Sequence, residues 1–398
     1  MARVLPPAGT PFVAADVASA ISGFFQPHAV EKFEQQIQKV TGASHAIAVN
    51  TGRTALTLAL LALKQDDART EVIIPGYTCF TVPSAIKRAG LRARLVDFAQ
   101  CTMQYDLKQL EKLETSNTLA IILIYPFAMY SDPEPILAWA KSRGIYVIED
   151  VAQGFGLRHS QKMLGTFGDI GIYSFSKGKT ITSVRGGVAV SSNERIGSRL
   201  QTLRASHCQS PSLVARLKII FEAIVLWIFL HPKRFGLITK LPFVKLGETH
   251  YDPEFTLSRM STPAASLATR KTRMLDEINN DRAKRGRNLL AQLHDAFLKR
   301  KIATVSESAS AQSLFLRTVL LASNQGARDT FLAEGKTLGF SRMYGEPLSV
   351  IDDPELWASK EKQSTPVAED FAHRMFTVPT HAFVTDNDIR AMIRILSV

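Results

Sequence analysis

The segment 168–187 combines an apolar run with a loop that carries two lysines. The run Ile170–Phe175 ends in a loop that contains serine and glycine, Lys177 and Lys179 follow, and Gly186-Gly187 permits a tight return. A lysine whose pKa is lowered by neighbouring cations and partial burial offers a neutral amine that attacks aldehydes. The alternative is that both lysines are solvated loop charges.

Two other segments place polar residues directly after apolar runs. Thr51-Gly52-Arg53 joins the run His45–Val49 to an expected helix. The N–H groups and dipole of that helix would face an anion such as a phosphate, and Arg53 would be an added partner. Asp150 follows the run Ile145–Glu149 and could bind a metal, a ribose or a protonated ring nitrogen. A helix cap is the commoner explanation of either segment taken alone.

Taken together and in their order along the chain, the three segments match the needs of one cofactor, pyridoxal phosphate. The turn Thr51-Gly52-Arg53 would hold the phosphate, Asp150 would keep the pyridine nitrogen protonated, and the lysine would form the Schiff base. The combination is more specific than any of its parts.

Short apolar runs alternate with helical stretches across the first half of the chain. Several runs are continuously apolar, as in strands covered on both faces. The rhythm predicts an α/β fold with a mainly parallel sheet of about seven strands, in which ligands bind beyond the carboxyl ends. The expected strands are His45–Val49, Glu71–Ile74, Arg94–Asp97, Leu119–Ile124, Ile145–Glu149, Ile170–Phe175 and Gly187–Ser191. The expected helices between them are Thr54–Lys64, Val82–Ala89, Leu107–Leu113 and Pro133–Arg143.

The second half begins with a strongly apolar stretch, Leu213–Leu230, which carries Arg216, Lys218 and Glu222. Its most apolar part is shorter than the roughly 20 residues that a membrane span needs. A buried or subunit-interface helix is one interpretation. A helix lying in a membrane interface, with its basic flanks on anionic headgroups, is the other.

The remainder of the chain predicts a smaller C-terminal α/β domain at 256–398, after a large domain at 1–255 that contains an apolar insertion at about 211–250. The expected elements are an irregular connector punctuated by Pro232, Pro242 and Pro253, one long helix at roughly Thr262–Lys299, strand-like sequence at Ser313–Ala322, and helices at Pro366–Arg374 and Asp386–Leu396.

The composition is globular, with 45% hydrophobic and 21% charged residues, which excludes a disordered or fibrous chain. The net charge of +12 fits anionic partners, but no recognition helix or zinc-finger spacing accompanies it, so nucleic acid is not an expected partner.

Cys79, Cys101 and Cys208 form no CxxC pair, which predicts neither disulfides nor a metal site. No signal-peptide core follows the N-terminus, so a cytoplasmic location is expected.

The same motifs resemble those of the DegT/DnrJ/StrS family of pyridoxal-phosphate sugar aminotransferases over most of the chain. The segments that carry the resemblance are Phe33-Glu34 with Val49–Gly52, Ile74–Thr78 with Ala89-Gly90 and Val96-Asp97, Val147–Gln153, Gly165–Asp169 with Ser174-Phe175, and Arg259–Ser261 with Leu275-Asp276 and Arg282. The resemblance implies pyridoxal-phosphate fold type I and a homodimer with its active site at the subunit interface.

The resemblance also implies roles for single residues. Lys179 would be the Schiff-base lysine and proton carrier, because Lys177 falls two positions too early. Asp150 would pair with the pyridine nitrogen, and Gln153 would reach the phenolic oxygen of the ring. The phosphate would lie against Thr51-Gly52 and Ser174. A dehydratase branch of the family has histidine in place of the lysine, so Lys179 favours transamination.

Four substitutions and one insertion depart from the family pattern. Arg53 stands where threonine is usual, and it is interpreted as a compensating phosphate ligand within the same subunit. Leu257 replaces an asparagine that commonly reaches the phosphate of the partner subunit, and Cys79 replaces an aromatic ring that stacks on the cofactor. Arg185 replaces a frequent glutamate, and Arg216–Tyr251 is the insertion.

The sequence therefore predicts an aminotransferase that converts a keto-sugar, nucleotide-linked, to an amino sugar in surface-glycan or polysaccharide biosynthesis, with L-glutamate as donor. Two alternatives stay open. One is an aminotransferase for a non-nucleotide carbonyl compound, and the other is a cofactor-binding regulatory or scaffold protein without turnover. The stretch 213–230 adds the prediction of peripheral contact with the inner face of a membrane. The predicted site residues are Thr51, Gly52, Arg53, Cys79, Asp150, Gln153, Ser174 and Lys179.

Overall fold

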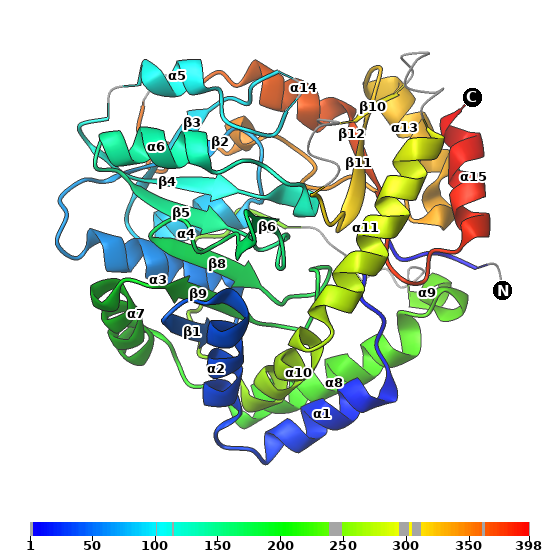
Figure 1. Ribbon diagram of the computed structural model, residues 1–398, viewed down its shortest axis with the longest axis horizontal. Helices are drawn as coiled ribbons and strands as arrows, with labels where there is room; N and C mark the ends of the chain where they lie inside the picture. The colour runs from blue at the N-terminus through cyan, green and yellow to red at the C-terminus, as the bar shows by residue number, and fades with distance from the viewer. Residues whose placement is uncertain are drawn as a thin grey trace.

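A seven-stranded sheet forms the centre of the computed structural model, with strand order β1-β9-β8-β5-β4-β2-β3 (Figure 1). The model describes residues 3–100, 102–113, 115–238, 249–293, 302–304, 312–359 and 363–397. Within the sheet β9 alone runs against its neighbours, so the predicted mainly parallel sheet is confirmed. The strands are β1 His45–Val49, β2 Glu71–Pro75, β3 Arg92–Val96, β4 Thr118–Ile124, β5 Tyr146–Asp150, β8 Ile170–Ser174 and β9 Gly187–Ser191.

Helices cover both faces of this sheet, which is why the strands are apolar on both sides. One face packs against α3 Gly52–Lys64, α4 Thr81–Arg88 and α7 Glu194–His207. The opposite face packs against α1 Ala14–Phe24, α2 Ala29–Thr41, α6 Glu134–Ser142, α8 Leu213–Phe229 and α10 Thr262–Thr272.

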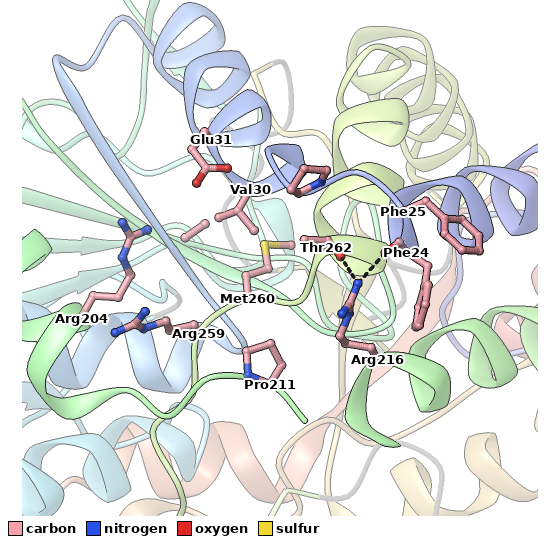
Figure 2. A pocket seen from close by; sticks show the side chains of 12 residues that line it. Phe24, Phe25, Val30, Glu31, Arg204, Pro211, Arg216, Arg259, Met260 and Thr262 are labelled. Atoms are coloured by element: carbon pink, nitrogen blue, oxygen red, sulfur yellow. Dashed lines mark hydrogen bonds between the residues drawn. The ribbon is translucent and has the colours of Figure 1, made fainter. Parts of the chain in front are cut away.

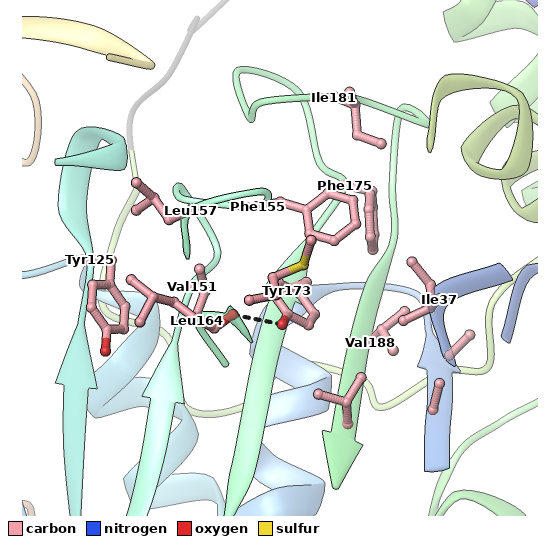
Figure 3. Close-up of a cluster of buried hydrophobic side chains, with 14 of the residues drawn as sticks. Ile37, Tyr125, Val151, Phe155, Leu157, Leu164, Tyr173, Phe175, Ile181 and Val188 are labelled. Carbon is pink, nitrogen blue, oxygen red and sulfur yellow. Dashed lines mark hydrogen bonds between the residues drawn. The ribbon is translucent and has the colours of Figure 1, made fainter. Parts of the chain in front are cut away.

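Aromatic rings support the middle of the sheet from the second of these faces (Figure 3). Phe155 lies 4.9 Å from the Tyr173 ring and 5.4 Å from the Phe175 ring, measured between ring centroids. The Tyr173 hydroxyl donates to the carbonyl of Leu164, so this buried phenol is satisfied. The packing fixes β8, the strand that leads into the lysine loop.

The C-terminal part forms a second α/β layer beside the sheet, with a three-stranded antiparallel sheet in the order β10-β11-β12. The long helix α11 Leu275–Gln292 connects the two parts (Figure 1). The C-terminal elements are β10 Ile302–Thr304, β11 Arg317–Ala322, α13 Gln325–Glu334, α14 Pro366–Arg374, β12 Met375–Pro379 and α15 Asp386–Leu396. The shorter elements of the chain are α5 Leu107–Glu111, η1 Pro126–Ala128, β6 Arg158–His159, β7 Lys162–Met163, η2 Lys336–Leu338 and η3 Leu348–Val350.

Three sequence-based expectations about elements were wrong. The connector after α8 is not all irregular, because Pro232 begins helix α9 Pro232–Ile238, where its missing N–H costs nothing. The expected long helix is two helices, α10 and α11, separated at Arg273-Met274. Strand β11 begins at Arg317 rather than Ser313, because Phe315 has a left-handed backbone at φ 53°. Pro242 and 294–299 lie outside the described residues.

Helix α8 contains 17 residues, and one side of it is buried against α1 and α10. Ile219 and Ala223 face this core, whereas Val214 and Phe221 are 74% and 64% exposed. A fully buried helix is therefore excluded. Within the described ranges, no helix has both the length and the apolar character to cross a membrane.

Candidate active site

Backbone close packing shapes a cup where β1, β9 and β8 meet. Val49 at the end of β1 and Ser174 at the end of β8 both pair with Gly187 at the start of β9. A Cβ on Gly187 would overlap the backbone of Thr51 and Gly52, and a Cβ on Gly52 would lie 3.0 Å from the Ser174 Cβ. Gly187 leaves no room for a Cβ, and a Cβ on Gly52 would require Ser174 to shift slightly, so the start of α3 lies directly against Ser174.

The N-terminus of α3 is the polar wall of this cup. Thr51 is the N-cap, and its Oγ1 accepts a hydrogen bond of 3.1 Å from the backbone N–H of Thr54. The Thr54 hydroxyl in turn donates to Asn50 Oδ1 at 2.7 Å. The first turn of the helix presents its N–H groups and the positive end of its dipole beside Ser174, which suits a phosphate.

Asp150 ends β5 on the same edge of the sheet and is buried. Burial raises the pKa of its carboxyl, while the hydrogen bond from the Ala152 N–H and the nearby Lys179 ammonium act in the opposite direction. Lys179 is half-buried in the loop after β8. The structure thus brings together the predicted acid and the predicted lysine as an electrostatically interacting pair.

The neighbouring acid, Glu149, has a structural role instead. It is fully buried, and it accepts hydrogen bonds from the Tyr125 hydroxyl and from the backbone N–H groups of Gly165, Phe167 and Gly168. These bonds hold the turn before β8. Of the two acids at the end of β5, Asp150 is the one that stays a candidate for the site.

Gln153 connects the site to a residue that the sequence analysis missed, Tyr344. Its Oε1 accepts a 2.6 Å hydrogen bond from the Phe127 N–H, and its Nε2 donates to the Tyr344 hydroxyl. That hydroxyl also interacts with the thiol of Cys79 and lies in the field of Asp150, and burial raises its pKa well above the usual value. Tyr344 therefore places a neutral phenol among three of the predicted cofactor residues.

The backbone of Tyr344 has φ 50°, which is unusual for a bulky residue and marks a conformation held by its surroundings. The Tyr77 hydroxyl donates to the carbonyl of Met343, and the Tyr77 and Tyr344 rings lie 5.8 Å apart. Local periodicity could not find Tyr344, since the residue lies in irregular chain between η2 and η3.

Arg53 points away from the cup. Its guanidinium lies 3.9 Å from the centroid of the Phe255 ring, and it donates to the carbonyl of Asp252 at 3.1 Å. Leu257, close by in the chain, is buried in the hydrophobic core. A role for Arg53 as a phosphate ligand stays a prediction that needs the side chain to leave Phe255.

The loop that contains Lys179 is tied to helix α8 by a carboxylate. Lys177 Nζ lies 2.7 Å from Glu222 Oε2, and Arg185 Nη2 lies 3.8 Å from Glu222 Oε1. Lys177 thus has a partner distinct from the candidate site.

Two adjoining cavities lie between α8 and the sheet and share Pro211, Arg259 and Met260. The smaller, of about 330 Å³, includes Asn50 at the edge of the cup and the cations Arg185, Lys218 and Arg259. The larger, of about 460 Å³, is lined by Phe24, Phe25, Val30, Glu31, Arg204, Pro211, Arg216, Arg259, Met260 and Thr262 among others (Figure 2). Both are rich in cations and fit anionic ligands.

A family model described as the DegT/DnrJ/EryC1/StrS aminotransferase family matches residues 15–397. GDP-perosamine synthase of Escherichia coli O157:H7 is 37% identical over 170 residues, which is 43% of this chain and 46% of that protein. GDP-perosamine synthase of Caulobacter vibrioides is 33% identical over 44% of this chain and 47% of its own length. The chain thus aligns with about half the length of the curated relatives it matches.

Solved structures share the fold over the whole chain. An E. coli GDP-4-keto-6-deoxy-D-mannose-3-dehydratase has a TM-score of 0.78 at 18% identity, with 100% of both chains covered. An aminotransferase from Psychrobacter cryohalolentis has a TM-score of 0.77 at 18% identity, covering 98% of this chain and 97% of that one. The predicted fold type I architecture is confirmed.

Proposed function

The chain belongs to the DegT/DnrJ/EryC1/StrS aminotransferase family, and from this premise we propose that it is a pyridoxal-phosphate-dependent aminotransferase that converts a nucleotide-linked keto-sugar to an amino sugar. The observation that carries the proposal is the pair formed by buried Asp150 and Lys179 beside the cup at Thr51-Gly52. The names of the curated relatives, GDP-perosamine synthases, support the substrate class and a role in polysaccharide biosynthesis.

The residues of the cup fit the cofactor. Thr51, Gly52 and Ser174 would hold the phosphate, Asp150 would face the ring nitrogen, and Gln153 would face the phenolic oxygen. Asp150 is buried among apolar strands, and an isolated buried carboxylate is costly in free energy. A cationic group such as a protonated ring nitrogen would reduce this cost. Pyridoxal phosphate, when bound, supplies the electron sink that stabilises charge on the carbon next to the amine.

The proposed reaction needs two ionisable side chains of the protein, Asp150 and Lys179. Asp150, whose ionised form is favoured by the nearby Lys179 ammonium, would hold the proton on the ring nitrogen of the bound cofactor. Lys179 would be the residue that bears the cofactor, and its amine, when free, would accept and return the proton that moves during amino transfer. Burial keeps the Tyr344 hydroxyl protonated, so this hydroxyl can donate a hydrogen bond beside Gln153 and Asp150.

The cationic cavity beside the cup supports a substrate that carries a diphosphate. Lys218 and Arg259 have no carboxylate partner among the described residues, and the Arg259 Nε is buried without a hydrogen-bond acceptor there. Equilibrium binding of GDP and UDP tests this use of the cavity, and Arg259→Gln is expected to weaken it about tenfold. Unchanged binding in the variant would place the diphosphate elsewhere.

The visible absorbance spectrum with and without L-glutamate tests the proposed function. A yellow band that bleaches on addition of L-glutamate is expected, and Lys179→Ala should lack the band. A band that L-glutamate leaves unchanged would point to another donor or to a binding protein without turnover. No band after reconstitution would overturn the proposal.

A homodimer is the proposed assembly, supported by the family resemblance. Leu257 stands at the position from which an asparagine of one subunit commonly reaches the phosphate of the other in this family, and here its side chain is buried in the same core cluster as Phe255. Light scattering on a size-exclusion column gives the mass directly. A monomer of 43.9 kDa with full activity would contradict the assembly.

The outer side of α8 supports peripheral contact of this cytoplasmic enzyme with an anionic membrane. The exposed apolar residues of α8 and of the adjacent α1 are Ile21, Phe25, Leu213, Val214, Leu217, Phe221 and Trp227. The exposed cations Lys218, Lys233 and Arg234 flank them. Anionic headgroups would neutralise these cations while the apolar side chains between them contact the membrane interface.

Co-sedimentation with vesicles tests this contact. Binding to vesicles that contain phosphatidylglycerol is expected, with much less binding to pure phosphatidylcholine and loss of binding at high salt. Protein that stays in solution with both kinds of vesicle at low salt would overturn the membrane contact. A dimer that dissociates when Leu217 is made charged would assign the same face to the subunit interface.

A further inference from the structure

The loop that carries Lys179 is fixed on its inner side by hydrogen bonds. The Phe175 N–H donates to the carbonyl of Gly186 at 2.8 Å, which closes the base of the loop. The Thr180 hydroxyl donates to the carbonyl of Gln153 at 3.1 Å, and Thr10 from the N-terminal segment donates to the carbonyl of Thr180 at 2.7 Å. These contacts anchor the residue after Lys179.

Within the loop, the Lys179 N–H donates to the carbonyl of Ser176 at 3.3 Å, and the Ser183 N–H donates to the carbonyl of Phe175 at 2.9 Å. On the outer side of the loop, ion pairs add contacts to helix α8. Lys177, two residues before Lys179, and Arg185, six residues after it, both reach Glu222 of α8. One carboxylate therefore spans the two arms of the loop. The side chains of Lys177 and Arg185 are 51% and 48% exposed, whereas that of Glu222 is 14% exposed.

Glu222 is the one acid in the sequence of α8, and it lies in the middle of the helix. A largely buried carboxylate in an apolar helix is costly unless cations pair with it. The contacts of α8 with the core come from apolar residues such as Ile219 and Ala223 and from Arg216, which donates to the Phe24 carbonyl, whereas Glu222 pairs with Lys177 and Arg185. The acid is therefore accounted for by the loop that it holds.

We propose that Glu222 is a positioning residue for Lys179: it clamps both arms of the lysine loop and neutralises the two cations that flank the lysine. The inference rests on the proposed function, since it assigns the task of Glu222 through Lys179. It also gives the apolar helix α8 a direct connection to the active site.

Removing the negative charge of Glu222 should shift the pH midpoint of the visible band in one direction. Lys179 linked to the cofactor carries a positive charge when the linkage is protonated, and extra positive charge nearby disfavours that form. Glu222→Gln leaves Lys177 and Arg185 without a counter-charge, so the pH midpoint of the visible band should fall. Because both cations are half exposed, the expected shift is modest, about 0.3 to 1 pH unit.

The experiment is a pH titration of the visible band in the reconstituted holoenzyme. Glu222→Gln should lower the midpoint, Glu222→Asp should keep it near the wild-type value, and the double variant Lys177→Gln/Arg185→Gln should raise it. The differences should shrink in 1 M NaCl, where the Debye length is about 3 Å. Midpoints that are equal in all four proteins would overturn the inference, and so would a Glu222→Gln shift that salt does not reduce.

Hydrogen–deuterium exchange of the same proteins separates this inference from the proposed function. Glu222→Gln should speed exchange in the segment 175–187, whereas Asp370→Asn, which removes an exposed ion pair with Arg374 in α14, should leave that segment unchanged. A wild-type protein without a visible band would overturn the proposed function, and exchange would still decide whether Glu222 holds the loop. Unchanged exchange in the Glu222→Gln protein would overturn the clamp.

Discussion

The cofactor cup and the outer side of α8 are built on opposite principles. At the cup, glycines bring the backbones of β9 and α3 into contact with Ser174, Asp150 is buried, and Lys179 is half-buried. On α8, large apolar side chains such as Phe221 are exposed to water. The cup tolerates little change in side-chain size, because its atoms are closely packed. The exposed side of α8 depends on apolar side chains, whatever their exact size. Substitutions should therefore act differently in the two regions.

The largest effect is expected from Lys179. Lys179→Ala should remove the visible band and lower the rate of transamination by at least about 1,000-fold, since no other group would carry the proton. Lys177→Ala is the matched control and should keep the band. Transamination by the Lys179→Ala protein, or a band lost from Lys177→Ala instead, would show that the wrong lysine of the loop has been assigned.

The next effect is expected from Asp150, whose pKa burial raises above its usual value. Ionised Asp150 is needed to hold the ring proton, so cofactor affinity should fall as the pH drops through this raised pKa. Asp150→Asn should bind the cofactor weakly at every pH, without this acid limb. Titration with pyridoxal phosphate at several pH values provides the measurement. Equal pH profiles for both proteins would contradict the role.

The same substitution should have the opposite effect on the protein without cofactor. A carboxyl whose pKa is higher in the folded state stabilises the fold fully only below the pKa of the unfolded chain, and this stability is lost as the pH rises through the folded pKa. At pH 7 Asp150→Asn should therefore raise the melting temperature of the cofactor-free protein. A lower melting temperature would mean that the hydrogen bond from Ala152 outweighs the burial cost.

A smaller effect is expected from the shape of the cup. Gly187→Ala would force its Cβ into the backbone of Thr51, which should cost about 1–3 kcal/mol of stability and weaken cofactor binding. Gly326→Ala, in α13, where a Cβ would make an ordinary contact of 3.4 Å with Asn324 Oδ1, is the control and should be neutral or slightly stabilising. Chemical denaturation compares the two. A Gly187→Ala protein that binds the cofactor normally would show that the cup can widen.

The smallest effect on catalysis is expected from the α8 face. Leu217→Glu/Phe221→Glu should reduce binding to phosphatidylglycerol vesicles about tenfold or more and leave transamination of a soluble substrate within about twofold. Val350→Glu, at an exposed apolar position elsewhere, should change neither. A loss of activity without any change in vesicle binding would mean that the two regions are not separable.

Much of the sheet and its edge could be predicted from the sequence, because the determinants are local. The expected bounds of β1, β9, α14 and α15 match the structure. Helix α15 has a capping box between Thr385 and Asp388, which is visible in the sequence as a pair of residue types at fixed spacing. The cup residues follow apolar strands directly, so topology brings them to one edge.

The features that were missed depend on contacts between distant segments. Nothing in the sequence marks Arg273-Met274 as a helix end, and close to this break Lys271 forms a buried ion pair with Asp16 of the distant helix α1. Tyr344 reaches Gln153 across 191 positions of the chain, so no local pattern connects them. Local patterns also could not show that Arg53 would lie on the Phe255 ring instead of facing the cup.

The reversed direction of β9 has a consequence for how this protein can diversify. Because β8 and β9 form an antiparallel pair, the loop that bears Lys179 leaves the sheet and returns to it on the same edge. Residues can be inserted into or deleted from this loop without changing the order or direction of the strands in the sheet. The lysine stays near Asp150 while the loop around it varies, so related enzymes can acquire new substrates by changing the length of this loop on an unchanged framework.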